Sequence, residues 1–153
     1  MSLPETRQKI EEILQPLVEA RSAFLVDIQI RSERGGKLVQ AFVDTDEGIT
    51  IELCADISRE LDRMLSLHQV FQGSFHIEVS SPGLDKPLKL LRQYRKNIGR
   101  KFKVRYRSNG EVMAFTGTLA ALNGDQLMFN PDSGEAVAIL FSQIVESKEE
   151  LPW

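Results

Sequence analysis

The chain reads Ser80-Ser81-Pro82-Gly83-Leu84-Asp85-Lys86-Pro87 at the point where its periodicity changes. Proline fixes φ, glycine accepts a positive φ, and serine and aspartate side chains bond to nearby backbone, so this run favours turns over regular structure. Helical and strand patterns precede it, whereas short strand patterns with tight turns follow it. We therefore predict an α+β protein with domains at 1–82 and 100–153, connected by a joint and short basic helix at 83–99.

Two helices are predicted in the first domain. Apolar residues at helical spacing predict one from Pro4 to about Arg21, which Pro16 should kink or interrupt. Thr50 is the expected N-cap of the second, because serine and threonine hydroxyls accept hydrogen bonds from the first turn. The apolar stripe of this second helix consists of Leu53, Ile57, Leu61, Met64 and Leu65.

Three strands complete the first domain. Apolar and polar residues alternate with period two within residues 24–30, 39–43 and 75–79. The glycine pair within 34–37 predicts a hairpin turn between the first two strands. The predicted order is αββαβ, a three-stranded sheet with two helices on one face.

The second domain is predicted to be all β. Phe102, Val104 and Tyr106 alternate with cations, and Asn123-Gly124 and Ser133-Gly134 are hairpin signals. Gly117 falls inside a long apolar run and predicts a bent strand. Five short strands with tight turns favour a small β-barrel, because closure hides strand edges.

Charge is distributed unevenly along the 153 residues, whose net charge is −3. Residues 1–82 carry 8 Lys and Arg against 14 Asp and Glu, whereas residues 83–153 carry 11 against 8. Ten cations and no acid lie between Lys86 and Arg107. Such a segment can present a basic stripe to phosphate, although a solvated surface without a partner explains the charge equally well.

The basic segment supplies the predicted binding residues. Alternation directs four cations of one strand to one face, where they repel one another unless an anionic partner neutralises them. Further cations upstream extend the candidate set. Tyr94 is the one candidate for stacking on a base, and Tyr106 is expected to be internal, so phosphate contact is favoured over base readout. The candidate partner or rRNA contacts are Lys86, Lys89, Arg92, Arg95, Lys101, Lys103, Arg105 and Arg107.

The sequence offers little catalytic or metal-binding chemistry. An acidic loop contains Asp44, Asp46 and Glu47, but Ile49 and Ala55 stand where a calcium loop needs glycine and glutamate. With Glu52, the loop leaves a magnesium-dependent hydrolase as an alternative. His68 and His76 lack a metal-binding pair spacing, and Cys54 lies beside the apolar stripe. We predict no catalytic residue, no metal and no cofactor.

The cysteine count and the distribution of apolar residues predict the cellular compartment of the protein. A single cysteine excludes an internal disulfide and fits a reducing cytoplasm. No secretory signal is visible, and no run approaches the roughly 18 apolar residues that cross a bilayer. We predict a cytoplasmic protein without a membrane partner.

A family resemblance rests on three stretches of the chain. The joint, extended to Glu78-Val79 upstream and Leu88 downstream, closely resembles the signature of the bacterial ribosome maturation factor RimP family. The loop carrying Asp44 and Gly48-Ile49-Thr50 is similar to that family too, as is Cys54-Ala55-Asp56-Ile57-Ser58-Arg59-Glu60-Leu61. Lys86 departs from the usual arginine, which keeps the charge but loses the bidentate fork.

The resemblance implies an N-terminal α/β domain and an SH3-like (Sm-like) C-terminal barrel. It implies binding to the immature small ribosomal subunit, with the barrel contacting a small-subunit ribosomal protein, and it implies neither catalysis nor a cofactor. From the residues, the joint formed by Ser80, Ser81, Pro82, Gly83 and Asp85 could fix the angle between the domains, bind a partner directly, or do both.

Three hypotheses follow. The leading one is a monomeric assembly factor whose basic face meets phosphate while its acidic first domain meets a basic protein. A general Sm-type RNA-binding module would bind unrelated single strands and form ring oligomers. A metal-dependent hydrolase would use Asp44, Asp46, Glu47 and Glu52 and would require tight binding of a divalent cation.

Overall fold

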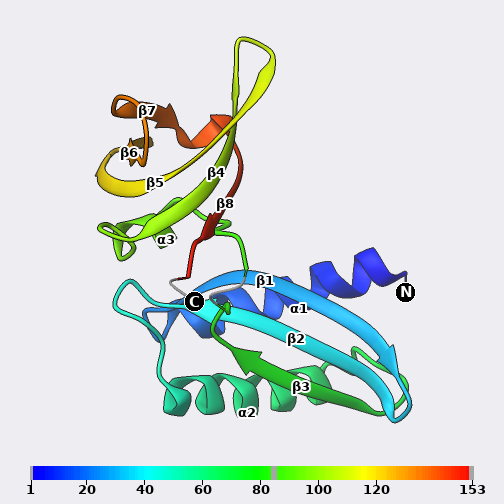
Figure 1. The fold of residues 1–153 in the computed structure, drawn as a ribbon. Coiled ribbons are helices and arrows are strands. Elements are labelled where there is room, and N and C mark those ends of the chain that lie inside the picture. Colours follow the sequence, from blue (N-terminus) through cyan, green and yellow to red (C-terminus); the bar gives the residue numbers. More distant parts are fainter. Residues whose placement is uncertain (1, 84–85, 152–153) are drawn as a thin grey trace. The chain divides into compact units, whose positions relative to one another are not determined.

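The computed structural model describes residues 2–83 and 86–151. The chain divides into two compact units, Met1–Pro82 and Gly83–Trp153 (Figure 1). Unit 1 contains α1 (Leu3–Glu19), β1 (Phe24–Glu33), β2 (Gly36–Asp44), α2 (Ile51–Leu67) and β3 (Phe75–Ser80). In the part of the chain that is described, no helix combines the length and the hydropathy needed to cross a membrane.

Helix α1 begins at the N-cap Ser2, whose hydroxyl accepts a hydrogen bond from the Glu5 amide. It continues through Pro16 to Glu19, so the prediction that Pro16 interrupts the helix is wrong. Pro16 lies in the last turn, where its missing N–H removes only one helical hydrogen bond. Its carbonyl still accepts from the Ala20 amide at 3.0 Å, which holds the final turn together.

Helix α2 begins where the sequence predicted. The Thr50 hydroxyl accepts a hydrogen bond from the Leu53 amide at 3.1 Å, which confirms Thr50 as the N-cap. Ile57, Leu61 and Leu65 are fully buried at spacings of four, so this face of α2 enters the core.

The sheet of unit 1 has the strand order β1-β2-β3. β1 and β2 form an antiparallel hairpin, whereas β2 and β3 run parallel because α2 carries the chain back between them. Alternate residues of β2, namely Val39, Ala41 and Val43, share one core with α1 and α2. The prediction of three strands with both helices on one face is confirmed.

Unit 2 is built from short elements after the joint. They are α3 (Arg92–Arg95), β4 (Lys101–Ser108), β5 (Glu111–Asn123), β6 (Gln126–Pro131), β7 (Val137–Leu140), the 3₁₀ turn η1 (Phe141–Gln143) and β8 (Ile144–Glu149). The strands form one antiparallel sheet in the order β7-β6-β5-β4-β8. The described residues show no pairing of β7 with β8 that would close it, so the barrel stays a prediction.

The long strand β5 passes close to its neighbour at Gly117. A Cβ atom at this position would lie 2.7 Å from the Asn130 carbonyl oxygen, so only glycine fits. The β5–β6 register shifts just beyond it, between Leu119 and Ala121. The core beneath the sheet includes Tyr94 of α3 with Phe102, Leu119 and Phe129.

Candidate nucleic-acid interface

Strand β4 separates apolar from cationic side chains. Phe102 and Val104 are 0% and 1% exposed, whereas the alternating positions 101, 103, 105 and 107 are all exposed. The predicted alternation is confirmed, and Tyr106 is half-buried in an edge-to-face contact with Phe115, as expected for an internal position. One side of β4 therefore carries cations only.

The neighbouring strand β8 adds a cation that sequence reasoning missed. Lys148 is exposed and lies directly opposite Lys103 in the β4–β8 register. Directly opposite residues of an antiparallel pair project from the same face of the sheet. We call this surface the β4–β8 basic face; it consists of Lys101, Lys103, Arg105, Arg107 and Lys148.

Two of these cations have acidic partners. Lys101 Nζ lies 2.7 Å from Asp132 Oδ2, and this hydrogen bond raises the pKa of Lys101. An Arg105 guanidinium nitrogen lies 3.7 Å from Glu146 Oε2. Both pairs are largely solvent-exposed and contribute little to stability, so their cations stay accessible to another anion.

The other three cations have no acidic partner among the described residues: Lys103, Arg107 and Lys148. Lys103 and Lys148 are directly opposite each other. Like charges in this position destabilise a strand pair by about 0.2–1 kcal/mol. A phosphate group between them would relieve this repulsion and release its counterions. The geometry is therefore suited to binding an anionic polymer.

The two cations of α3, Arg92 and Arg95, belong to a different side of β4. Tyr94 of α3 contacts Phe102 with ring centroids 6.5 Å apart, and Phe102 points away from the basic face. Helix α3 therefore lies on the inward side of β4, although Arg92 and Arg95 are exposed on it. Lys86 is half-buried and Lys89 is exposed in the segment before α3. Arg92 and Arg95 therefore do not form one stripe with the basic face.

Tyr94, the one candidate for stacking on a base, cannot take that role. Tyr94 is 0% exposed and packs against Phe102 and Phe141, so its ring cannot meet a nucleic-acid base. The adjacent Gln93 is also buried, and its side-chain oxygen accepts hydrogen bonds from the amides of Lys89 and Leu90 at 2.7 Å. The Tyr94 contacts hold α3 against the sheet, whereas the Gln93 bonds hold the segment before it. A four-residue helix is too short for hydrophobic periodicity to predict either set of contacts.

The joint is only partly described. Ser80 ends β3, and Ser80, Ser81 and Gly83 are exposed while Pro82 is half-buried. Asp85 lies outside the described residues. After the joint, the Leu88 amide donates a hydrogen bond to the Ser147 carbonyl of β8 at 2.8 Å.

The acidic loop is not arranged as a metal site. Asp44 is 5% exposed at the end of β2 and accepts a hydrogen bond from the Thr45 amide, whereas Asp46 and Glu47 are exposed. Among residues 2–83 and 86–151, no group of three His, Cys, Asp or Glu side chains could hold a metal ion. The Asp44 side chain therefore stabilises the turn that follows β2.

The remaining candidates are two histidines and a cysteine. His68 caps the C-terminus of α2, and His76 is exposed on β3. Cys54 packs beside the core of unit 1, and burial raises the pKa of its thiol, with the Asp44 charge adding to the effect. A thiol with a raised pKa is a poor nucleophile at neutral pH.

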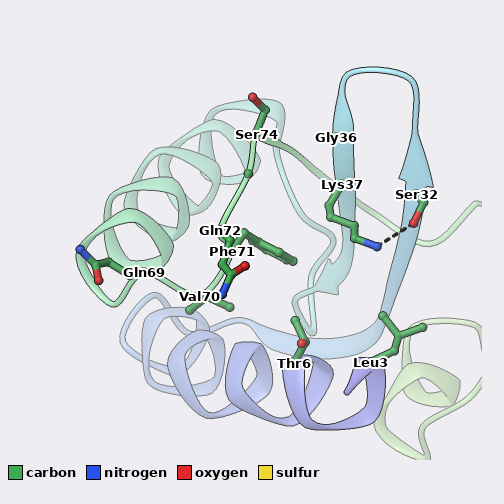
Figure 2. A pocket seen from close by; sticks show the side chains of 11 residues that line it. Leu3, Thr6, Ser32, Gly36, Lys37, Gln69, Val70, Phe71, Gln72 and Ser74 are labelled. Carbon is green, nitrogen blue, oxygen red and sulfur yellow. Dashed lines mark hydrogen bonds between the residues drawn. The ribbon is translucent and has the colours of Figure 1, made fainter. Parts of the chain in front are cut away.

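A cavity of about 620 Å³ lies in unit 1 between the start of α1, the turn end of the β1–β2 hairpin and the loop after α2. Figure 2 shows Leu3 and Thr6 of α1, with Lys37 bonded to Ser32 across the hairpin. Lys37 is its one charged lining residue among those described. The cavity lacks paired groups for acid–base chemistry.

One comparison with known proteins identifies the first unit. Residues 13–85 match a family model described as the RimP N-terminal domain. The matched region runs from within α1 through the end of β3 into the joint.

Proposed function

The chain belongs to the RimP family of ribosome maturation factors, and on this premise we propose that it binds the immature small ribosomal subunit and assists its assembly without catalysing a reaction. The family match is the observation that carries this proposal. The absence of a catalytic role is inferred from the family.

The β4–β8 basic face is the proposed contact with rRNA. Five cations project from it, and Lys103 and Lys148 face each other without an ion-pair partner among the described residues. Since Tyr94 is buried and Tyr106 is internal, contacts to phosphate explain the surface better than base stacking. The cations Lys86, Lys89, Arg92 and Arg95 would form a second contact.

The acidic first unit would meet a different kind of surface. Its 14 acidic residues outnumber its 8 cations, which suits a basic ribosomal protein. We further propose a cytoplasmic monomer in which the five-stranded sheet curls into an SH3-like barrel. The joint residues would hold the two surfaces at an angle that lets two weak contacts act together.

Sedimentation of cell extract tests the function directly. The protein should travel with free small subunits and should be missing from translating ribosomes, because an assembly factor leaves before translation begins. Equal amounts on translating ribosomes, or no association with small subunits at all, would refute the proposal.

A further inference from the structure

The free edge of β1 offers backbone hydrogen bonds beside an apolar groove. We propose that an extended segment of a partner protein, with alternating apolar and polar side chains and one acidic residue, pairs antiparallel with β1 at Ile30 and Ser32. This proposal does not depend on the basic face or on rRNA binding. It concerns the first unit alone.

The direction of the β1 backbone follows from two observations. A guanidinium nitrogen of Arg7, on α1, donates to the Ile28 carbonyl, so the polar backbone groups of Ile28 point away from β2. The Ile28 amide is bonded on the same edge by Asp27 Oδ1 at 2.9 Å. The hairpin turn leads to the same assignment. Glu33 and Gly36 close a two-residue turn as a hydrogen-bonded pair, so Ile28, an odd number of residues from Glu33, directs its backbone groups away from β2.

Alternate residues of a strand point to the same edge, so Ile30 and Ser32 also direct their N–H and C=O groups away from β2. Among the described residues, neither has a backbone partner on that edge. The Arg7–Asp27 pair thus protects the edge at Ile28 and leaves the next two positions open. Open edges of this kind pair readily with another strand.

A groove of about 460 Å³ runs beside these positions between α1 and β1. Its lining is mainly apolar and includes Leu3, Pro4, Ile28 and Ile30. Leu3 is 56% exposed there, so its apolar side chain is available to a partner. The partner residue opposite Ile30 would place its side chain over this groove, so it should be apolar.

The other face of the sheet specifies the acidic residue. Glu78 accepts from the Gln40 side chain at 3.0 Å, and the Gln40 side-chain oxygen accepts from Arg31 at 2.6 Å. This ladder crosses β3, β2 and β1 and ends on the Arg31 cation, which has no carboxylate partner among the described residues. An added strand would continue the ladder with a carboxylate opposite Arg31.

A designed peptide provides the probe. The capped sequence Val-Thr-Val-Glu-Val-Thr-Val would be titrated into the ¹⁵N-labelled full chain and followed by amide shifts. We expect shifts and slowed exchange at Ile30 and Ser32. Replacing its glutamate with lysine should weaken binding about two- to fivefold, the size of one cross-strand charge pair. The Arg31→Glu protein should bind the lysine peptide more tightly than the glutamate peptide.

Backbone methylation supplies the matched control. N-methylation of the valines, whose amides would face β1, should abolish binding, whereas N-methylation of the threonines should leave it intact. Equal binding of the two methylated peptides, or no shift at Ile30 and Ser32, would overturn the proposal. Concentration-dependent protection of these amides without peptide would also overturn it, because a second copy of the chain would then occupy the edge.

Discussion

Tyr94 shows how one buried side chain can be misinterpreted from sequence. It sits among cations in a segment of ten Lys and Arg residues, which is the setting of a nucleic-acid contact. In the structure its ring fills the core of unit 2. Its hydroxyl is buried and makes no hydrogen bond to the other described residues. The side chain therefore contributes through its ring rather than its hydroxyl.

Tyr94→Phe should consequently be as stable as the unchanged chain, within about 1 kcal/mol, because it removes a hydroxyl that lacks a partner. Tyr94→Ala should lose about 3–5 kcal/mol through the cavity it creates. Urea unfolding followed by circular dichroism measures both. A phenylalanine variant as unstable as the alanine variant would show that the hydroxyl is the stabilising group.

The same residue predicts a pH dependence. Burial raises the pKa of Tyr94 above its ordinary value of 10.0. Above about pH 10 the unfolded chain loses this proton first, so the free energy of unfolding should fall as pH rises. For Tyr94→Phe, the free energy of unfolding measured by urea titrations at pH 9 to 11 should fall less steeply. Parallel curves for the two chains would contradict this cause.

Cys54 should be slow to react in the folded chain. Burial and Asp44 raise the pKa of its thiol above the ordinary 9.0, which lowers the thiolate fraction at pH 8. Iodoacetamide should therefore label Cys54 more slowly in the native protein than in urea, with the native rate still rising above pH 9. A native rate equal to the unfolded rate would contradict burial of the thiol.

At the scale of elements, the close approach of β3 to the β1–β2 hairpin rests on Gly36. Its φ of 121° and the Ser74 carbonyl oxygen, 2.0 Å from the place of a Cβ atom, both require glycine. The adjacent Gly35 has room, since the nearest atom to its Cβ position is a His76 nitrogen at 3.4 Å. Gly36 is therefore essential for packing, whereas Gly35 is not.

Gly36→Ala should destabilise the protein by more than about 2 kcal/mol, because the new methyl group meets rigid backbone in a strained conformation. Gly35→Ala, the matched control, should change stability by less than about 1 kcal/mol. Thermal unfolding of the two variants compares them directly. Equal losses would mean that the Ser74 contact does not determine the packing of this hairpin.

Local patterns predicted most elements, and long-range pairing explains what they missed. The Thr50 hydroxyl cap and the alternation along β4 depend on residues close in sequence, so both were predictable. The pairing of Lys103 with Lys148 depends on β8 returning to β4 rather than to β7. The parallel pairing of β2 with β3 was likewise invisible, because strand register is a tertiary property.

At the scale of the whole chain, charge is divided between the two units. The first unit is acidic, and the second carries the β4–β8 basic face. An RNA–protein particle presents both phosphate and basic protein, so oppositely charged units could engage it together. The basic face of unit 2 should therefore determine the salt dependence of binding.

The salt dependence of binding to purified immature small subunits tests that claim most directly. Lys103→Glu combined with Lys148→Glu should weaken binding at least tenfold and should flatten the slope of log affinity against log salt by about 1 for each lost phosphate contact. Lys9→Glu, a reversal at an exposed position of α1, should leave the slope unchanged. If the double variant binds with the affinity and slope of the unchanged chain, the basic face is not the contact with rRNA.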